Sequence, residues 1–266
     1  MLNRKQINTG HHTLSIADVG EGPAIVLLHG FCGSADYWEP VVNRLSSSYR
    51  CIVPDLHGHG QSPAPASPYT LEAIAHDVYH ILDQLDIHRF IVLGHSLGGY
   101  ATLAFAEAHQ EGLAGMGLIH STPLPDTDEA KQNRLNGVEN IRRDGIRSFV
   151  DQLVPKLFAP EHVKTLSDQV AHVKGIGYET SAEGATGMLH AMRARPDRQT
   201  VLSASSVPVL LVAGADDQVI PPEKTHVVQG DPIQSHTLAN CGHMGMFEAQ
   251  EELTAHIKQF ADHCFK

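Results

Sequence analysis

Cysteine is scarce in this chain. It contributes four of the 266 residues, and no two cysteines have CxxC spacing. A small disulfide-stapled fold needs a denser framework of cysteines, and a zinc knuckle needs CxxC pairs, so neither is indicated. We therefore expect reduced thiols at all four positions, which are Cys32, Cys51, Cys241 and Cys264.

Positive charge and long apolar runs are also lacking. The chain has 19 Lys and Arg against 30 Asp and Glu, which gives a formal net charge of -11. Such a charge repels phosphate backbones and anionic lipids, so we expect no nucleic acid partner and no membrane partner. No apolar stretch is long enough to span a bilayer, and residues 1–6 lack the apolar run of a signal peptide. We expect a cytoplasmic protein, and the oligomeric state stays open.

Metal-binding patterns are missing despite 19 histidines. His11 and His12, like His57 and His59, have no carboxylate or cysteine at ligand spacing, and the HExxH pattern does not occur. We therefore expect no functional metal.

Short apolar runs that end in glycine or turn residues recur along the chain. Bounded runs of this kind are typical of central strands in a parallel sheet covered on both faces. A helical apolar stripe follows Thr70, which is a suitable N-cap, and another runs from Leu253 to Cys264. Strands that alternate with helices predict an α/β fold with a mostly parallel, twisted sheet flanked by helices, in one domain over residues 1–266. The expected strands are 24–28, 51–53, 90–93, 116–119 and 209–213.

The alternation stops between about residues 122 and 198, where helical patterns follow one another without a strand run. We expect a helical insertion of about four helices within the domain. Its last helix is opened by a capping-box pair, Thr180 and Glu183. The expected helices are 128–143, 145–153, 160–174 and 182–193.

Residues 94–98 read Gly-His-Ser-Leu-Gly and stand between a predicted strand and a helix-forming run. A serine on so sharp a turn needs strained backbone angles, and the flanking glycines remove Cβ atoms that would clash as strand and helix approach each other. The turn also leads into a helix N-terminus, which favours negative charge developing nearby. The pattern predicts Ser96 as a nucleophile.

A serine nucleophile needs a base and an acid that orients the base. Asp216 and Asp217 follow the 209–213 strand, at the edge where active sites of parallel sheets lie. His243 lies on a glycine-flanked loop before the last helix, and the order serine, aspartate, histidine is the one that accompanies this turn. For the oxyanion we expect two backbone amides, those of Leu97 and Phe31. We expect His29 to brace its loop rather than to act as a second base.

Together these segments resemble the α/β-hydrolase superfamily over nearly the whole chain. The resemblance rests on residues 29–31, 55–62, 94–99, 214–217 and 242–243. It implies Asp217 rather than Asp216 as the acid, a structural role for the 55–62 loop, and a helical cap for the insertion, similar to the caps of small esterase and lactonase-like members. Haloalkane dehalogenases and epoxide hydrolases of this fold are similar to each other in using aspartate where this chain has Ser96, which argues against both activities.

The resemblance implies a serine hydrolase that cleaves a carboxylic ester or lactone of a small to medium substrate without a cofactor. The substrate is expected between core and cap, against Cys32, Trp38, Leu124 and Met188. Two alternatives stay open: hydrolysis of a carbon–carbon bond in a diketone-like substrate, and a hydrolase-like ligand receptor with slow turnover.

Overall fold

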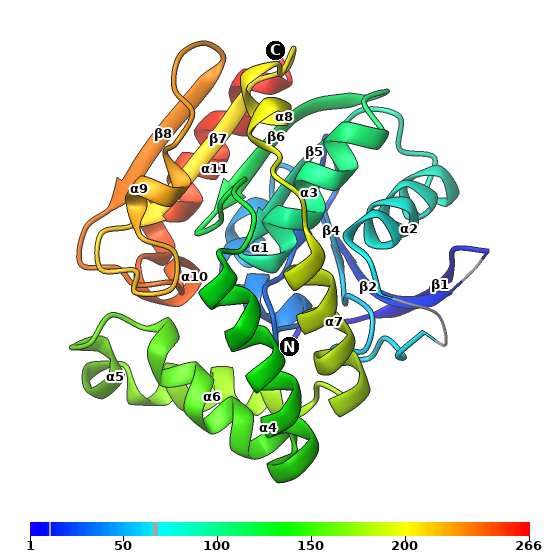
Figure 1. The fold of residues 1–266 in the computed structure, drawn as a ribbon. Coiled ribbons are helices and arrows are strands. Elements are labelled where there is room, and N and C mark those ends of the chain that lie inside the picture. The colour runs from blue at the N-terminus through cyan, green and yellow to red at the C-terminus, as the bar shows by residue number, and fades with distance from the viewer. Residues whose placement is uncertain (11, 66–68) are drawn as a thin grey trace.

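The described residues of the computed structural model, 1–10, 12–65 and 69–266, form an eight-stranded sheet in the order β1-β2-β4-β3-β5-β6-β7-β8 (Figure 1). β1 and β2 are antiparallel to their neighbours, and all later pairs are parallel. The α/β prediction is thereby confirmed; His11 lies outside the described residues. The strands are β1 Lys5–Asn8, β2 Thr13–Val19, β3 Ala24–Leu28, β4 Arg50–Pro54, β5 Phe90–His95, β6 Leu113–Ile119, β7 Val209–Gly214 and β8 Ile233–Leu238.

The five apolar runs found in the sequence are β3 to β7, the central parallel strands. Every residue of β3, β5 and β7 is buried, so these strands read as unbroken apolar runs. The sequence analysis missed β1, β2 and β8. β1 and β8 lie at the sheet edges, where β1 is largely exposed and β8 is only partly buried, which leaves them without a continuous apolar pattern.

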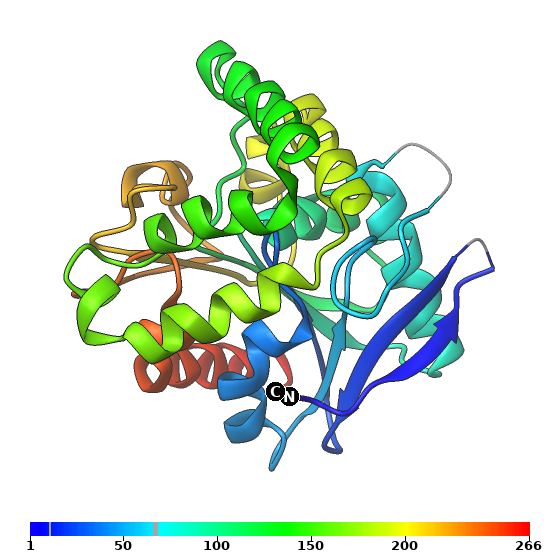
Figure 2. The same ribbon diagram turned by 90° about the horizontal axis from the view of Figure 1, so that it is seen from below.

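Helices cover both faces of the sheet. Figure 2 shows α2 (Leu71–Gln84) and α3 (Leu97–Ala108) on one side, and α1 (Glu39–Leu45) and α11 (Gln250–Cys264) on the other. Thr70 caps α2 by accepting a hydrogen bond from the Ala73 amide, as predicted. Among the helices of the described ranges, none combines the length and the apolar character that crossing a membrane requires.

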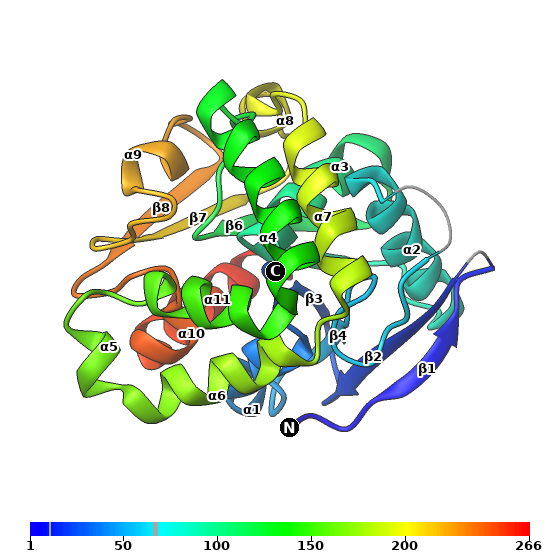
Figure 3. The same ribbon diagram turned by 60° about the horizontal axis from the view of Figure 1, so that its bottom comes forward.

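Five helices follow one another between β6 and β7, and α4, α6 and α7 gather at one end of the molecule, in front of the sheet in Figure 3. The helices are α4 Asp128–Leu153, α5 His162–Thr165, α6 Ser167–Tyr178, α7 Ala182–Ala194 and α8 Gln199–Ser203. Shorter elements elsewhere are the 3₁₀ helices η1 Ala35–Trp38 and η2 Val154–Leu157, and the helices α9 Pro222–Thr225 and α10 Gly245–Glu248.

Two details of this helical segment differ from the sequence prediction. α7 is capped by Ser181, whose side chain accepts a hydrogen bond from the Gly184 amide, so the capping box of Thr180 and Glu183 is wrong by one residue. The predicted helix 160–174 is divided into α5 and α6, because Leu166 departs from helical geometry. Gly145, at φ 80°, interrupts α4 where the sequence predicts one helix to end and another to begin.

Buried histidines hold the loops that follow β3 and β4. The Leu56 amide donates a hydrogen bond to Nε2 of His29 at 2.9 Å, which is the bracing expected of His29. Nδ1 of His59 donates to the His57 carbonyl at 2.8 Å. The Asp55 carboxylate accepts hydrogen bonds from the Ala35 amide at 2.7 Å and from a second amide of its own loop. These hydrogen bonds keep both loops in place beside the carboxyl ends of the strands.

Close backbone approach at the start of α3 requires glycine. A Cβ on Gly98 would lie 2.3 Å from the carbonyl oxygen of Leu28 in β3, and a Cβ on Gly94 would lie 2.1 Å from the carbonyl oxygen of Gly98. Both obstacles are backbone atoms, which cannot move away as a flexible side chain would. α3 therefore packs directly against β3 and β5.

Gly98→Ala should lower the free energy of unfolding by about 2 kcal/mol, since the added methyl group overpacks the crossing of α3 and β3. Gly175→Ala is the matched control: this glycine lies in α6, where an added methyl group would have no neighbouring atom within 4 Å, and alanine there should raise stability by about 0.5–1 kcal/mol. Urea unfolding of both variants measures the difference. Equal midpoints for the two variants would contradict the packing argument.

Acid should destabilise the fold through its buried histidines. Burial lowers the pKa of His29 from 6.5 to about 4 and that of His59 to about 3. Below pH 6.5 the unfolded chain takes up these protons and the folded chain does not, so the free energy of unfolding should fall as the pH drops from 6.5 towards 4, by roughly 3 kcal/mol for each histidine. Urea unfolding of the wild type at several pH values measures this slope.

His59→Gln should flatten the pH dependence of stability. His88→Gln, which changes a side chain that is 78% exposed, should leave it as in the wild type. A wild-type stability that is constant between pH 7 and pH 5 would refute the role of the buried histidines.

Candidate active site

Ser96 occupies the turn between β5 and α3 with a left-handed backbone, φ 51° and ψ −112°. A non-glycine residue held there stores on the order of 1–3 kcal/mol of strain, so its surroundings must impose it. They do so through hydrogen bonds to neighbouring backbone: the Ser96 amide donates to the Ile119 carbonyl at 3.0 Å, and the Ser121 hydroxyl donates to the Ser96 carbonyl at 2.7 Å. The strand, turn and helix predicted around Ser96 are present.

Asp217 and His243 meet at the carboxyl end of β7. Nδ1 of His243 donates to Oδ2 of Asp217 at 2.7 Å, and Oδ1 of Asp217 accepts from the amides of Val219 and Ile220 at 2.8 and 2.9 Å. Both side chains are buried, whereas Asp216 is exposed. Of the two adjacent aspartates, Asp217 is therefore the one that contacts the histidine.

The Asp217 carboxylate is held in its ionised form. Burial by itself would raise its pKa, but the interactions of the carboxylate with His243 and with His120 outweigh burial and hold the pKa below its ordinary range. Asp217 is therefore a fixed negative charge at neutral pH, oriented by two backbone amides.

Two further histidines surround this pair, and the sequence analysis singled out neither. Nδ1 of His120 lies 3.4 Å from Oδ2 of Asp217, and Nε2 of His95 lies 2.8 Å from the His243 carbonyl oxygen. Burial lowers the pKa of both imidazoles, so both are neutral at pH 7. His120 directly follows β6, and that position at a strand's carboxyl end is the signal that could have identified it.

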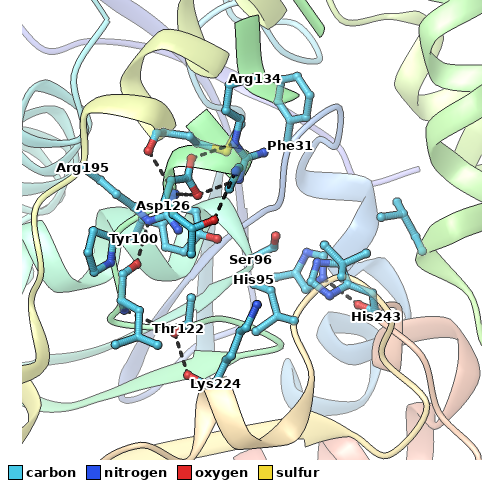
Figure 4. Close-up of a pocket in the computed structure, with 18 of the residues that line it drawn as sticks. Phe31, His95, Ser96, Tyr100, Thr122, Asp126, Arg134, Arg195, Lys224 and His243 are labelled. Carbon is cyan, nitrogen blue, oxygen red and sulfur yellow. Dashed lines mark hydrogen bonds and ion pairs between the residues drawn. The ribbon is translucent and has the colours of Figure 1, made fainter. Parts of the chain in front are cut away.

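A cavity of about 200 Å³ opens in front of Ser96 and His243 (Figure 4). Of the lining residues proposed from the sequence, Leu124 does line it, whereas Cys32, Trp38 and Met188 are fully buried in the core. Met192, one turn after Met188 on α7, reaches the cavity instead. The other lining residues that the sequence analysis missed include Tyr100, Thr122, Asp126, Arg134, Arg195 and Lys224.

The amides of Phe31 and Leu97 are the two that the sequence analysis expects to bind an oxyanion. Phe31 lines the cavity, and Leu97 is the first residue of α3, where helical amides have no partner within the helix. In the loops and caps of the described ranges, no hydrogen bond to another protein group is donated by the amide of either residue. The amides of Phe31 and Leu97 thus remain candidates for binding the oxyanion.

Side chains able to hold a metal ion gather at two places in the described part of the chain. One group is His120, Asp217 and His243, and the other is His12, His57 and Asp77. The sequence analysis missed the second group because Asp77 lies in α2, far along the chain from His12 and His57. Its carboxylate oxygens already accept hydrogen bonds, from Nε2 of His57 at 2.6 Å and from the Thr9 hydroxyl at 2.5 Å. These hydrogen bonds join the residue that follows β1, the loop after β4 and α2.

Several known proteins are similar to this chain in sequence or in structure. A putative carbamate hydrolase of Variovorax paradoxus is 30% identical over 76% of this chain and 76% of its own. The structure of a thermophilic esterase from Thermogutta terrifontis superposes with a TM-score of 0.92 at 27% identity, covering 99% of this chain and 100% of that one. Uncharacterized mycobacterial proteins are 42% identical over 33% of this chain, and the match spans only 26% of their length.

A family model described as the alpha/beta hydrolase fold matches residues 23–250. That range contains the Ser96 turn, Asp217 and His243, and it covers most of the chain. The chain therefore belongs to the α/β-hydrolase fold family.

Proposed function

We propose that this protein hydrolyses a carboxylic ester or lactone of small to medium size through an acyl-enzyme formed on Ser96. The observation that carries the proposal is that Ser96 and His243 line one cavity while His243 is hydrogen-bonded to the buried, ionised Asp217. A serine, an imidazole and an orienting carboxylate are the groups that acyl transfer requires. The likeness to an esterase and to a carbamate hydrolase supports the same reaction class.

The first half of the reaction forms the acyl-enzyme. Nε2 of His243 removes the proton from the Ser96 hydroxyl as the serine oxygen attacks the ester carbonyl. The bond to the leaving alcohol then breaks, and the alkoxide takes that proton from His243. Asp217 keeps the imidazole in the tautomer that presents Nε2 to Ser96 and stabilises its transient positive charge.

The second half regenerates the enzyme. His243 removes a proton from water, the resulting hydroxide attacks the acyl carbonyl, and the carboxylic acid leaves as Ser96 recovers its proton. In both halves the amides of Phe31 and Leu97 donate to the carbonyl oxygen while it carries negative charge. Their lack of protein partners in loops and caps of the described residues supports this assignment.

Stopped-flow hydrolysis of 4-nitrophenyl acetate tests whether the protein is an enzyme or a slow receptor. We expect steady release of 4-nitrophenol over many turnovers. A single stoichiometric burst followed by almost no release would instead mean that the protein acylates once and does not turn over, which would overturn the proposal.

Ser96→Ala should lower kcat/KM for 4-nitrophenyl acetate by about a thousandfold or more, because the acyl-enzyme can no longer form. Circular dichroism should show an intact fold. Ser47→Ala is the matched control, since this serine is exposed, hydrogen-bonds only to the Arg44 carbonyl and lies outside the cavity. Retention of more than about a tenth of wild-type activity in Ser96→Ala would remove Ser96 from the mechanism.

The adjacent aspartates provide an internal comparison. Asp217→Asn should favour the wrong imidazole tautomer and lower kcat by a factor that reaches ~10⁴ for the same change in serine proteases. Asp216→Asn changes an exposed side chain and should alter kcat by less than about threefold. If Asp216→Asn proved the more damaging substitution, the acid assignment would pass to Asp216.

A further inference from the structure

The charge of the cavity is opposite in sign to that of the whole chain. Three cationic side chains line it, those of Arg134, Arg195 and Lys224, against the single carboxylate of Asp126. The chain as a whole carries a formal net charge of -11. An acidic protein thus surrounds a cavity with an excess of positive charge next to the serine proposed to react.

The guanidinium of Arg195 is occupied by contacts within the protein. Its terminal nitrogen lies 2.7 Å from Oδ1 of Asp126, its Nε donates to the Leu124 carbonyl at 3.0 Å, and its Cζ atom lies 4.0 Å from the centre of the Tyr100 ring. Arg134 takes the other oxygen of Asp126 at 3.1 Å. The carboxylate is therefore shared between both arginines, and this cluster holds the start of the helical segment against α7 and α3.

Lys224 differs from both arginines. Its backbone in α9 is fixed, because the Thr122 hydroxyl donates to the Lys224 carbonyl at 2.6 Å. Its ammonium group forms no ion pair with any carboxylate of the described ranges, and Figure 4 shows the side chain extending towards Ser96. The nearby Asp217 does not balance it, since that carboxylate is completely buried and already paired with His243.

We propose that the cavity selects an anionic substrate: an ester or lactone that carries a free carboxylate, bound by the ammonium group of Lys224. An exposed cation that lines the same cavity as Ser96 and has no ion pair with a carboxylate of the described residues is suited to form a charge-assisted hydrogen bond to such a group. This inference rests on the proposed ester hydrolysis and adds the class of substrate.

Matched substrates test the inference. The half-ester 4-nitrophenyl hydrogen glutarate and the neutral 4-nitrophenyl pentanoate have acyl chains of equal length and differ in the terminal carboxylate. We expect the wild type to favour the anionic ester in kcat/KM, and Lys224→Gln to lower the anionic-to-neutral ratio about tenfold, mostly through KM. Raising the salt concentration should lower the wild-type ratio, because a partly exposed ion pair is screened.

Two further variants sharpen the comparison. Lys164→Gln removes an exposed lysine of α5 outside the cavity and should keep the wild-type ratio. Lys224→Glu should reverse the preference, towards an ester that bears an ammonium group.

A second substrate pair, phenyl butyrate and 4-carboxyphenyl butyrate, places the carboxylate on the alcohol side of the ester. A ratio that depends on Lys224 in either pair supports the inference. Ratios in both pairs that are insensitive to Lys224 would overturn it.

A binding measurement separates this inference from the proposed function. Glutarate should bind Ser96→Ala, as measured by calorimetry, and should bind the double variant with Lys224→Gln about tenfold more weakly. Ester hydrolysis without any effect of Lys224 on substrate ratio or glutarate binding would refute the anionic substrate alone. Glutarate binding that depends on Lys224, in a protein that hydrolyses neither ester, would refute the proposed hydrolysis instead.

Discussion

The left-handed backbone at Ser96 is the constraint on which the rest of the site depends. It lifts the serine out of β5 and begins α3 at once, which leaves the Leu97 amide without a helical partner. The conformation persists because α3 lies directly on β3 and β5, an approach that only glycine permits at residues 94 and 98. The packing of α3 on the central sheet therefore offsets the backbone strain at Ser96.

The site combines one buried negative charge, that of Asp217, with two neutral imidazoles, those of His95 and His120. Asp217 is buried yet ionised because His243, His120 and two backbone amides solvate it in place of water. His95 and His120 are kept neutral by burial and so do not compete with His243 for a proton at pH 7. The proposed base is thus the one imidazole of this group that faces both the cavity and the carboxylate. Lys224 adds the positive charge that we assign to substrate recognition.

Features carried by local pattern could be predicted from the sequence, and features that depend on packing between distant segments could not. The five central strands and the turn at Ser96 follow from apolar runs and glycines within a few residues of one another. Edge strands such as β8, which is only partly buried, leave no such pattern. The lining of the cavity is the clearest failure: Met188 and Met192 lie on the same helix, and only the way α7 packs decides that Met192 reaches the cavity. Asp77 beside His57 was missed for the same reason, because 20 residues separate them in the chain.

The central claim is that Ser96 is the nucleophile activated by His243 and Asp217. Covalent labelling with a fluorophosphonate tests it most directly, since this reagent phosphonylates an activated serine and leaves ordinary hydroxyl groups unmodified. Mass spectrometry of the digested protein should find one adduct per chain, on Ser96, forming far more slowly in Asp217→Asn and not at all in His243→Ala. An adduct on another residue such as Ser121, or a labelling rate at Ser96 that is the same in all three proteins, would contradict the account.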